Sequence, residues 1–357
     1  MKKIITFCLI LFCLAGFFAL PLQAREKKVD ELLGAGASFP YPLYSKWFDV
    51  YAKTHGVKVN YQSIGSGGGI RQLKNKTVDF GASDAYLSKE DVEQFSGKVV
   101  HIPTALGAVA VVYNLPIEDQ VKITPDLITD IFLGKIKSWQ DQKIAEANPG
   151  VKLPKMPILV VRRSDGSGTT FIFTDYLSKI SREWESKVGR GKSVQWPVGI
   201  GGKGNEGVAG NVRNLPGSIG YVEIIYAEKN NLKYARIKNK SGNYLEPTLE
   251  SISLAANVDL PGDMRVSITN TDAAQGYPIA GFTWLLVYTD QNYDNRSKAV
   301  AMATKNLMHW SITAAQQYNE KLLYAKLPKA AQEKAMKLVK SIHYGDDPLK
   351  IEEDEKK

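Results

Sequence analysis

The chain has 357 residues, of which 46 are lysine or arginine and 37 are aspartate or glutamate, so its formal net charge is +9. The charges are spread along the chain, which argues against a nucleic-acid groove. The two cysteines, Cys8 and Cys13, lie in an apolar N-terminal stretch, so the rest of the chain has no thiol for a disulfide or a thiolate metal site. A chain of this length can instead rely on packed cores, and it has room for two domains.

Residues 1–24 have the layout of a secretory signal peptide. Lys2 and Lys3 precede an apolar run, which ends near the small residue Ala24. We therefore expect export and removal of this segment. Because the apolar run is nearly long enough to span a bilayer, an uncleaved anchor is the alternative.

Short apolar runs alternate with helical patterns in the remaining chain, which predicts an α/β fold. Residues 57–62 alternate between apolar and polar, as in a half-buried strand. Residues 107–115 and 157–161 are continuously apolar, as expected for strands covered on both faces.

Helices are predicted where apolar residues recur with helical spacing. This spacing appears within residues 43–51 and again after Thr124 and Pro125, which have the chemistry of a helix start. From about residue 296 to residue 342 the pattern is almost wholly helical. We expect a helical C-terminal region, followed by a charged tail at residues 350–357.

The same local arrangement occurs four times: a predicted strand, a loop rich in Gly, Ser, Thr or Asp, and a helical start. The four loops are residues 34–40, 63–69, 81–85 and 163–171. A helix N-terminus has free N–H groups and the positive end of a dipole, so it can bind an anion without a lysine. Serine and threonine add hydroxyl donors. Together the loops predict an anion site.

Some residues in these loops also have a purely local interpretation. Ser38 could be the cap of the following helix. Ser88 and Asp91 have the spacing of a capping box, which leaves Asp84 without a local task. Arg163 could be a solvated charge, but it ends an apolar strand, and ligands of α/β sheets lie at such ends.

Nucleotide-binding motifs are present only in part. Residues 199–204 have the G-x-G-x-x-G spacing, with Glu223 at a suitable distance, but the segment before them is broken by Pro197. Residues 191–193 resemble the end of a phosphate loop, yet the glycine that the motif requires is replaced by Ser186.

An enzyme is harder to assemble from the residue types available. Ser167 lies between two glycines but lacks the spacing of a nucleophile elbow. Four histidines are scattered without metal-ligand spacing, so we expect them to be packing or surface residues. They are His55, His101, His309 and His343. We expect no metal and no cofactor.

Six sequence blocks, in order and spacing, resemble the periplasmic phosphate-binding protein of ABC phosphate importers. The blocks are GAGASFPYPLYSKW, IGSGGG, VDFGASDA, VRRSDGSGTTFIFTDYL, GGKGNEGVAG and LPGSIGYVE. The resemblance runs from about residue 33 to residue 349, nearly the whole chain after the leader. It implies a periplasmic protein, a monomer without enzymatic activity, that delivers inorganic phosphate to the membrane permease subunits.

The resemblance also implies roles for individual residues. Donors to phosphate would come from the four loops, Asp84 would accept a proton from the ligand, and Arg163 would form a charged fork held by Asp165. The donors are Ser38, Phe39, Ser66, Ser167, Gly168 and Thr169. Ser38 stands where the family often has threonine, which preserves the hydroxyl.

The fold implied is the type II periplasmic-binding-protein architecture, with two α/β lobes joined by two crossovers and the ligand between them. One lobe would comprise residues 29–104 plus 280–349, and the other residues 105–279. A binder of sulfate or molybdate in the same fold, a secreted phosphatase and an adhesive protein without a ligand are the alternatives. Asp84 argues against the first, because sulfate has no proton to share.

Overall fold

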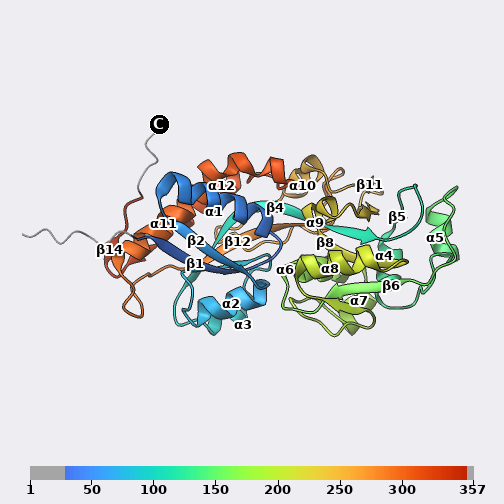
Figure 1. Ribbon diagram of the computed structural model, residues 1–357, viewed down its shortest axis with the longest axis horizontal. Helices are drawn as coiled ribbons and strands as arrows, with labels where there is room; N and C mark the ends of the chain where they lie inside the picture. The colour runs from blue at the N-terminus through green and yellow to red at the C-terminus, as the bar shows by residue number, and fades with distance from the viewer. Residues whose placement is uncertain (1–28, 352–357) are drawn as a thin grey trace, which may run out of the picture.

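The structure, a computed structural model, describes residues 29–351. The signal peptide expected at residues 1–24 and most of the charged tail expected at residues 350–357 lie outside the described residues. The molecule is elongated, with two halves side by side along its long axis (Figure 1). Within residues 29–351, no helix has the length and apolar character needed to cross a membrane.

The first half combines the start and the end of the chain. Its strands are β1 (Glu31–Gly36), β2 (Lys58–Ser63), β3 (Phe80–Ser83), β4 (Val99–Tyr113), β12 (Ala280–Tyr288), β13 (His343–Tyr344) and β14 (Asp347–Pro348). Its helices are α1 (Tyr41–His55), α2 (Ser66–Lys74), α3 (Lys89–Glu93), α11 (Lys298–Ile312) and α12 (Lys329–Lys340), with 3-10 turns at Ala314–Tyr318 and Glu320–Leu322.

The second half is formed by the middle of the chain. Its strands are β5 (Lys122–Ile123), β6 (Leu159–Arg163), β7 (Ile200–Gly202), β8 (Ser218–Glu223), β9 (Lys233–Tyr234), β10 (Arg236–Lys238) and β11 (Tyr244–Leu245). Its helices are α4 (Pro125–Phe132), α5 (Gln142–Ala147), α6 (Gly168–Ile180), α7 (Arg182–Lys187), α8 (Gly204–Asn214), α9 (Ile224–Lys229) and α10 (Leu249–Ala255).

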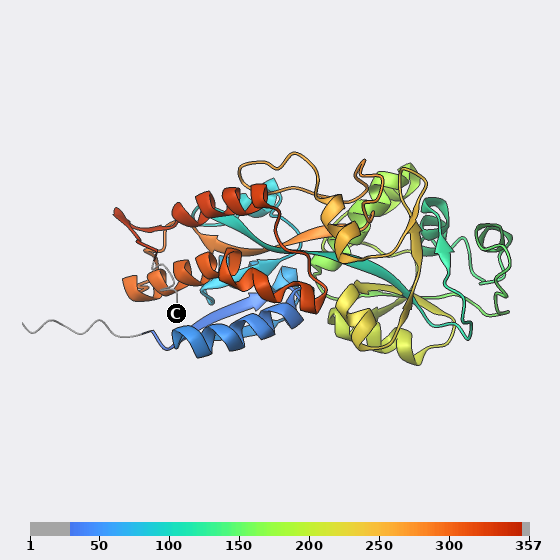
Figure 2. The same cartoon turned by 90° about the horizontal axis from the view of Figure 1, so that it is seen from above.

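One strand, β4, belongs to both halves. The main sheet has the order β2-β1-β3-β12-β4-β8-β6-β7, and β9 also pairs with β4. β4 pairs with β12 up to Ala108 and with β8 from Val109 onward. Helices α1, α11 and α12 cover one face of the first half, and α2 and α3 cover the other (Figures 1 and 2).

The predicted periodicities correspond to the observed elements. The apolar spacing at residues 43–51 forms the buried side of α1, where the ring of Trp47 meets that of Trp310 edge-on, with 6.0 Å between their centroids. Thr124 caps α4 by accepting a hydrogen bond from the Leu127 amide. The capping box of Ser88 with Asp91 is present at the start of α3. The prediction of a mixed α/β fold is confirmed.

The loops after β1, β2 and β3 in the first half face the loops after β6 and β7 in the second. In a parallel arrangement the carboxyl ends of strands lie at one edge, where ligand sites form. The glycine motif at residues 199–204 also lies at this edge, but its relation to the strand differs from that in a dinucleotide-binding loop. Its strand, β7, lies within the motif and not before it, which is incompatible with a dinucleotide loop.

Candidate functional site

The structure brings all the predicted donor loops together at the boundary between the halves. Each loop contributes side chains that are at most 3% exposed. These buried residues are Ser38, Phe39, Ser66, Asp84, Arg163, Ser167 and Thr169. They form a polar cluster inside a protein whose other buried positions are mainly apolar, so their polar groups must satisfy one another or a ligand.

Ser66 and Asp84 of the first half contact the start of α6 in the second. The Ser66 hydroxyl lies 3.4 Å from Asp84 Oδ2 and accepts hydrogen bonds from the amides of Asp84 at 3.2 Å and Gly168 at 3.0 Å. A Cβ atom at position 168 would come within 2.5 Å of both Asp84 Oδ2 and Ser66 Oγ. Only glycine permits this close approach.

Arg163 is oriented by a two-point ion pair with Asp165. Its Nε donates to Asp165 Oδ1 at 2.8 Å and its Nη2 to Oδ2 at 2.5 Å, while Nη1 donates to Thr169 Oγ1 at 3.3 Å. Burial raises the pKa of Asp165, but the hydrogen bonds and charge of Arg163 outweigh this and hold the pKa below its usual value. A guanidinium has five N–H groups, and hydrogen bonds within residues 29–351 occupy three of them.

Asp84 is a buried carboxyl whose neighbours act in opposite directions on its pKa. Thr283 of β12 donates to its Oδ1 at 2.7 Å. Burial raises the pKa of the Asp84 carboxyl to about 7, and the hydrogen bond from Thr283 and the charge of Arg163 limit that rise. An acidic group with a pKa near neutrality, close to an arginine, is typical of a functional site.

The loop of Ser38 and Phe39 is held by two tyrosines. The Tyr226 hydroxyl donates to the Ser38 carbonyl and the Tyr324 hydroxyl to the Phe39 carbonyl, both at 2.6 Å. In a trans peptide the amide points opposite to the carbonyl, so the bond from Tyr226 fixes the direction of the Phe39 N–H. Ser38 is not the cap of α1, since the N-cap is Pro40 and no side chain bonds to it.

Asn205, in the first turn of α8, was not predicted as a site residue. Its amide donates to Ser38 Oγ at 3.2 Å, and its Nδ2 donates to Ser38 Oγ at 3.0 Å and Thr169 Oγ1 at 3.1 Å. Its Oδ1 accepts from the Glu223 amide at 3.0 Å. The sequence contained a pattern that could have indicated it, because residues 199–207 are a fifth example of a strand followed by a glycine-rich loop and a helix start.

The start of α6 also follows the predicted pattern. Ser167 is its N-cap and accepts a hydrogen bond from the Thr170 amide at 3.0 Å, so its own hydroxyl hydrogen remains to be donated. Gly168 and Thr169 follow as the first helical residues. The helix therefore presents its N-terminal end to the cluster.

The histidines do not join this cluster as ligands of a metal. His101 accepts a hydrogen bond from the Leu87 amide through Nε2, and burial lowers the pKa of its imidazole to about 3. His343 lies against Asp290 in the C-terminal segment. Among residues 29–351, no three His, Cys, Asp or Glu side chains are arranged so that they could hold a metal ion.

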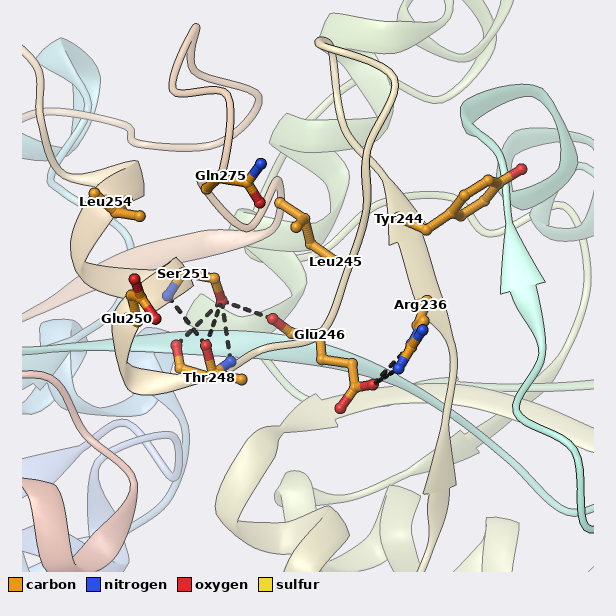
Figure 3. A pocket seen from close by; sticks show the side chains of 9 residues that line it. All are labelled: Arg236, Tyr244, Leu245, Glu246, Thr248, Glu250, Ser251, Leu254 and Gln275. Atoms are coloured by element: carbon orange, nitrogen blue, oxygen red, sulfur yellow. Dashed lines mark hydrogen bonds and ion pairs between the residues drawn. The ribbon is translucent and has the colours of Figure 1, made fainter.

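A hollow of about 300 Å³ lies away from the cluster, between the β10–β11 hairpin and α10 (Figure 3). Arg236 at its edge is paired with Glu246, and Thr248 and Ser251 bond to each other as the capping box of α10. These polar groups are satisfied by their neighbours, so they have a structural explanation that needs no ligand.

The fold is that of a substrate-binding protein: a model described as PBP superfamily domain matches residues 22–315. Relatives share a more specific description. The phosphate-binding protein PstS of Pasteurella multocida is 43% identical over 331 residues, covering 91% of this chain and 93% of its own. That of Xylella fastidiosa (strain 9a5c) is 45% identical over 313 residues, covering 86% and 84%. The chain belongs to the PstS family of phosphate-binding proteins.

Solved structures agree on the fold. A phosphate-binding protein from Stenotrophomonas maltophilia superimposes with a TM-score of 0.65 at 20% identity, covering 86% of this chain and 92% of its own. An ABC-type phosphate transport receptor from Vibrio cholerae gives 0.54 at 17% identity, covering 83% and 100%. The type II periplasmic-binding-protein fold and the family resemblance inferred from the sequence are therefore confirmed.

Proposed function

We propose that the chain binds inorganic phosphate between two lobes and delivers it to the permease of an ABC-type phosphate importer. It acts in the periplasm after removal of its signal peptide, as a monomer, and performs no chemistry on the ligand. The observation that carries this proposal is the buried cluster in which Arg163, Asp84 and the start of α6 meet. The family relationship supports it independently.

The lobes we propose are residues 29–104 plus 280–349 and residues 105–279. The first boundary lies within β4, close to the point where its partner changes from β12 to β8. The second lies where β12 begins at Ala280. A hinge in these two crossovers allows the lobes to close around a ligand.

In this proposal the buried residues surround phosphate with directed donors. Hydroxyls and backbone amides come from Ser38, Phe39, Ser66, Ser167, Gly168 and Thr169, and Arg163 supplies its two remaining N–H groups with Asp165 as its support. A dehydrated phosphate is costly unless its oxygens find donors. The planar guanidinium can engage two oxygens side by side, which a lysine cannot do.

Asp84 gives the site its selectivity in this proposal. Both forms of phosphate near neutral pH carry at least one O–H, which a carboxylate can accept. Sulfate has no such proton and is repelled. A site that depends on a ligand hydroxyl can reject an analogue without it by roughly 10⁴–10⁵-fold.

Titration calorimetry of the mature protein with phosphate and sulfate tests the proposal directly. We expect heat and tight binding with phosphate and far weaker binding of sulfate and molybdate. No heat with phosphate, or equal affinity for sulfate, would refute it. Turnover of a chromogenic phosphate ester, with or without divalent metal, would favour a phosphatase, and absence of any oxyanion binding would favour an adhesive protein.

Asn205 provides the first mutational test. Its Nδ2 donates to the hydroxyls of Ser38 and Thr169, which leaves both hydroxyl hydrogens for the ligand. Asn205→Asp replaces these donors by an acceptor and adds a negative charge, so we expect calorimetry to show phosphate affinity lower by at least about tenfold. Asn211→Asp, in the same helix, is the control and should change little. Unchanged affinity in Asn205→Asp would contradict this role.

An ion pair between the proposed lobes provides the second test. Lys192 Nζ lies 2.5 Å from Asp91 Oδ2, and both side chains are about one-quarter exposed, at 25% and 24%. Lys192→Gln should speed phosphate release in stopped-flow measurements by up to about fivefold, since such pairs contribute at most about 1 kcal/mol. The difference should shrink at high salt because salt screens exposed charges.

The matched control is Lys187→Gln, which breaks a pair within α7 between Lys187 and Glu183. This pair lies inside one proposed lobe, so its loss should leave the release rate unchanged. Equal effects of the two substitutions would show that the Lys192 pair has no particular part in closure.

A further inference from the structure

Thr283 is a buried residue of β12 whose side chain the sequence did not single out. It is fully buried, and its hydroxyl donates to Asp84 Oδ1 at 2.7 Å although the two residues are 199 positions apart. Strands β12 and β3 are paired neighbours, with Trp284 opposite Ser83. The contact therefore lies within one half of the molecule and does not depend on how the halves meet.

A β-bulge builds the surroundings of Thr283. The pairing of β12 with β4 shifts register between Thr283 and Trp284, so that Thr104 of β4 is the extra residue. The Thr104 hydroxyl donates to the Thr283 carbonyl at 3.1 Å and lies 2.7 Å from the Tyr44 hydroxyl. A carbonyl can only accept, so the single hydroxyl hydrogen of Thr104 is donated to the Thr283 carbonyl. The Tyr44 hydroxyl is therefore the donor to the Thr104 hydroxyl. These two hydrogen bonds fix the position of the Thr283 backbone.

The bond from Thr283 determines which oxygen of Asp84 faces the donor loops. Within residues 29–351, the Thr283 hydroxyl has Asp84 Oδ1 as its acceptor. A proton on Oδ1 would displace the Thr283 hydrogen from its acceptor, so the bond from Thr283 favours the ionised form of the carboxyl. The other oxygen, Oδ2, lies toward Ser66 and Gly168, where the donor loops meet.

We propose that Thr283 is a specificity-determining positioning residue, which keeps Asp84 ionised and turns Oδ2 toward the O–H of a protonated oxyanion. The inference rests on the proposed function of the cluster. Asp84 alone would become a neutral acid once buried, and a neutral carboxyl can donate a hydrogen bond to sulfate. Thr283 extends the pH range over which sulfate is refused.

Among the groups around Asp84, Thr283 and Arg163 have the largest effects that lower the pKa of its carboxyl. Burial raises the pKa of Glu223 on β8 well above its usual value, which favours the neutral form of this carboxyl. Burial likewise raises the pKa of the facing tyrosines, which stay uncharged. These tyrosines are Tyr44, Tyr61 and Tyr324. The charge of Arg163 lowers the pKa of the Asp84 carboxyl, and the hydrogen bond from Thr283 lowers it more.

The test measures sulfate affinity of the mature protein by calorimetry from pH 5 to pH 9, for wild type, Thr283→Val and Thr283→Ser. Sulfate does not titrate in this range, so its profile reports the protein. Loss of the donor raises the pKa of Asp84, so the pH below which sulfate binds should move upward by about one unit in Thr283→Val, a tenfold effect at fixed pH. Thr283→Ser keeps the hydroxyl and should keep the wild-type profile.

Two further measurements separate the outcomes. Glu223→Gln should leave the sulfate profile in place, because the titrating group is Asp84. If Thr283→Val does not fold, carboxyl-carbon NMR of wild type, assigned with Asp84→Asn, gives the protonation state of Asp84 directly. The inference is overturned if Thr283→Val has the wild-type profile, or if Asp84 is protonated at a pH where sulfate is still rejected. Failure of wild type to bind phosphate would instead refute the proposed function.

Discussion

Arg163→Ala should weaken phosphate binding by about 2–5 kcal/mol, the range for truncating one member of a buried, hydrogen-bonded charge pair. The side chain of Arg163 is 1% exposed and is locked by Asp165, so it needs no reorganisation to meet an anion. Its removal also leaves the Asp165 carboxylate unpaired near the ligand, which adds to the loss. Titration calorimetry on the mature protein measures the effect.

The neighbouring Arg162 offers a matched control. It alternates to the other face of β6 and is half-buried, with Nη1 donating to the Arg163 carbonyl at 3.3 Å. Arg162→Ala should therefore leave phosphate affinity nearly unchanged. Arg163→Lys retains the charge but not the fork, so we expect it to recover only part of the loss. A loss below about 1 kcal/mol in Arg163→Ala would place the guanidinium outside the ligand shell.

Asp84→Asn should reduce selectivity for phosphate over sulfate far more than it reduces phosphate affinity. The amide has N–H groups that can donate to any oxyanion, so the repulsion that excludes sulfate disappears. We expect the ratio of the two affinities at pH 8 to fall by about 10² or more, since a site of this kind can supply roughly 10⁴–10⁵. Competition calorimetry with both anions gives the ratio.

The effect should depend on pH in a defined direction. Burial raises the pKa of Asp84 to about 7, so the wild-type carboxyl is increasingly neutral as the pH falls below that value. The difference between wild type and Asp84→Asn should therefore be greatest above pH 7 and diminish toward pH 5. Asp49→Asn, which removes an exposed carboxylate of α1 paired with Lys53, is the control. A selectivity ratio unaffected by Asp84→Asn would remove Asp84 from the proposed mechanism.

The sequence was sufficient for the parts of the site that are local. Residues 163–171 carry the strand end, the arginine and the helix start in one short segment, so their types and order predict a helix N-terminus that can bind an anion. The charged fork of Arg163 with Asp165 was implied by the family resemblance. Strand and helix periodicities predicted the α/β class for the same reason, because each depends on neighbours a few residues away. The family resemblance then supplied the connection between the loops.

The residues that were missed act over long distances in the chain. Thr283 is an ordinary β-branched residue in an apolar strand, and only the pairing of β12 with β3 brings it to Asp84. The glycine-rich loop before α8 indicated the region of Asn205, but its bonds to Ser38 cross 167 positions. Periodicity contains no information about such contacts, which depend on tertiary packing.

Direct bonds already cross the boundary between the halves in this structure. The Gly67 amide donates to the Gly166 carbonyl at 2.8 Å, and the Gly168 amide donates to the Ser66 hydroxyl. In the proposed function these contacts stabilise the closed form of the protein even without phosphate. The observed affinity then equals the intrinsic affinity multiplied by the fraction of molecules that are closed. Substitutions at these contacts should therefore change the affinity for phosphate without changing the preference for one anion over another. Affinity and selectivity would then be set by different residues of the same molecule.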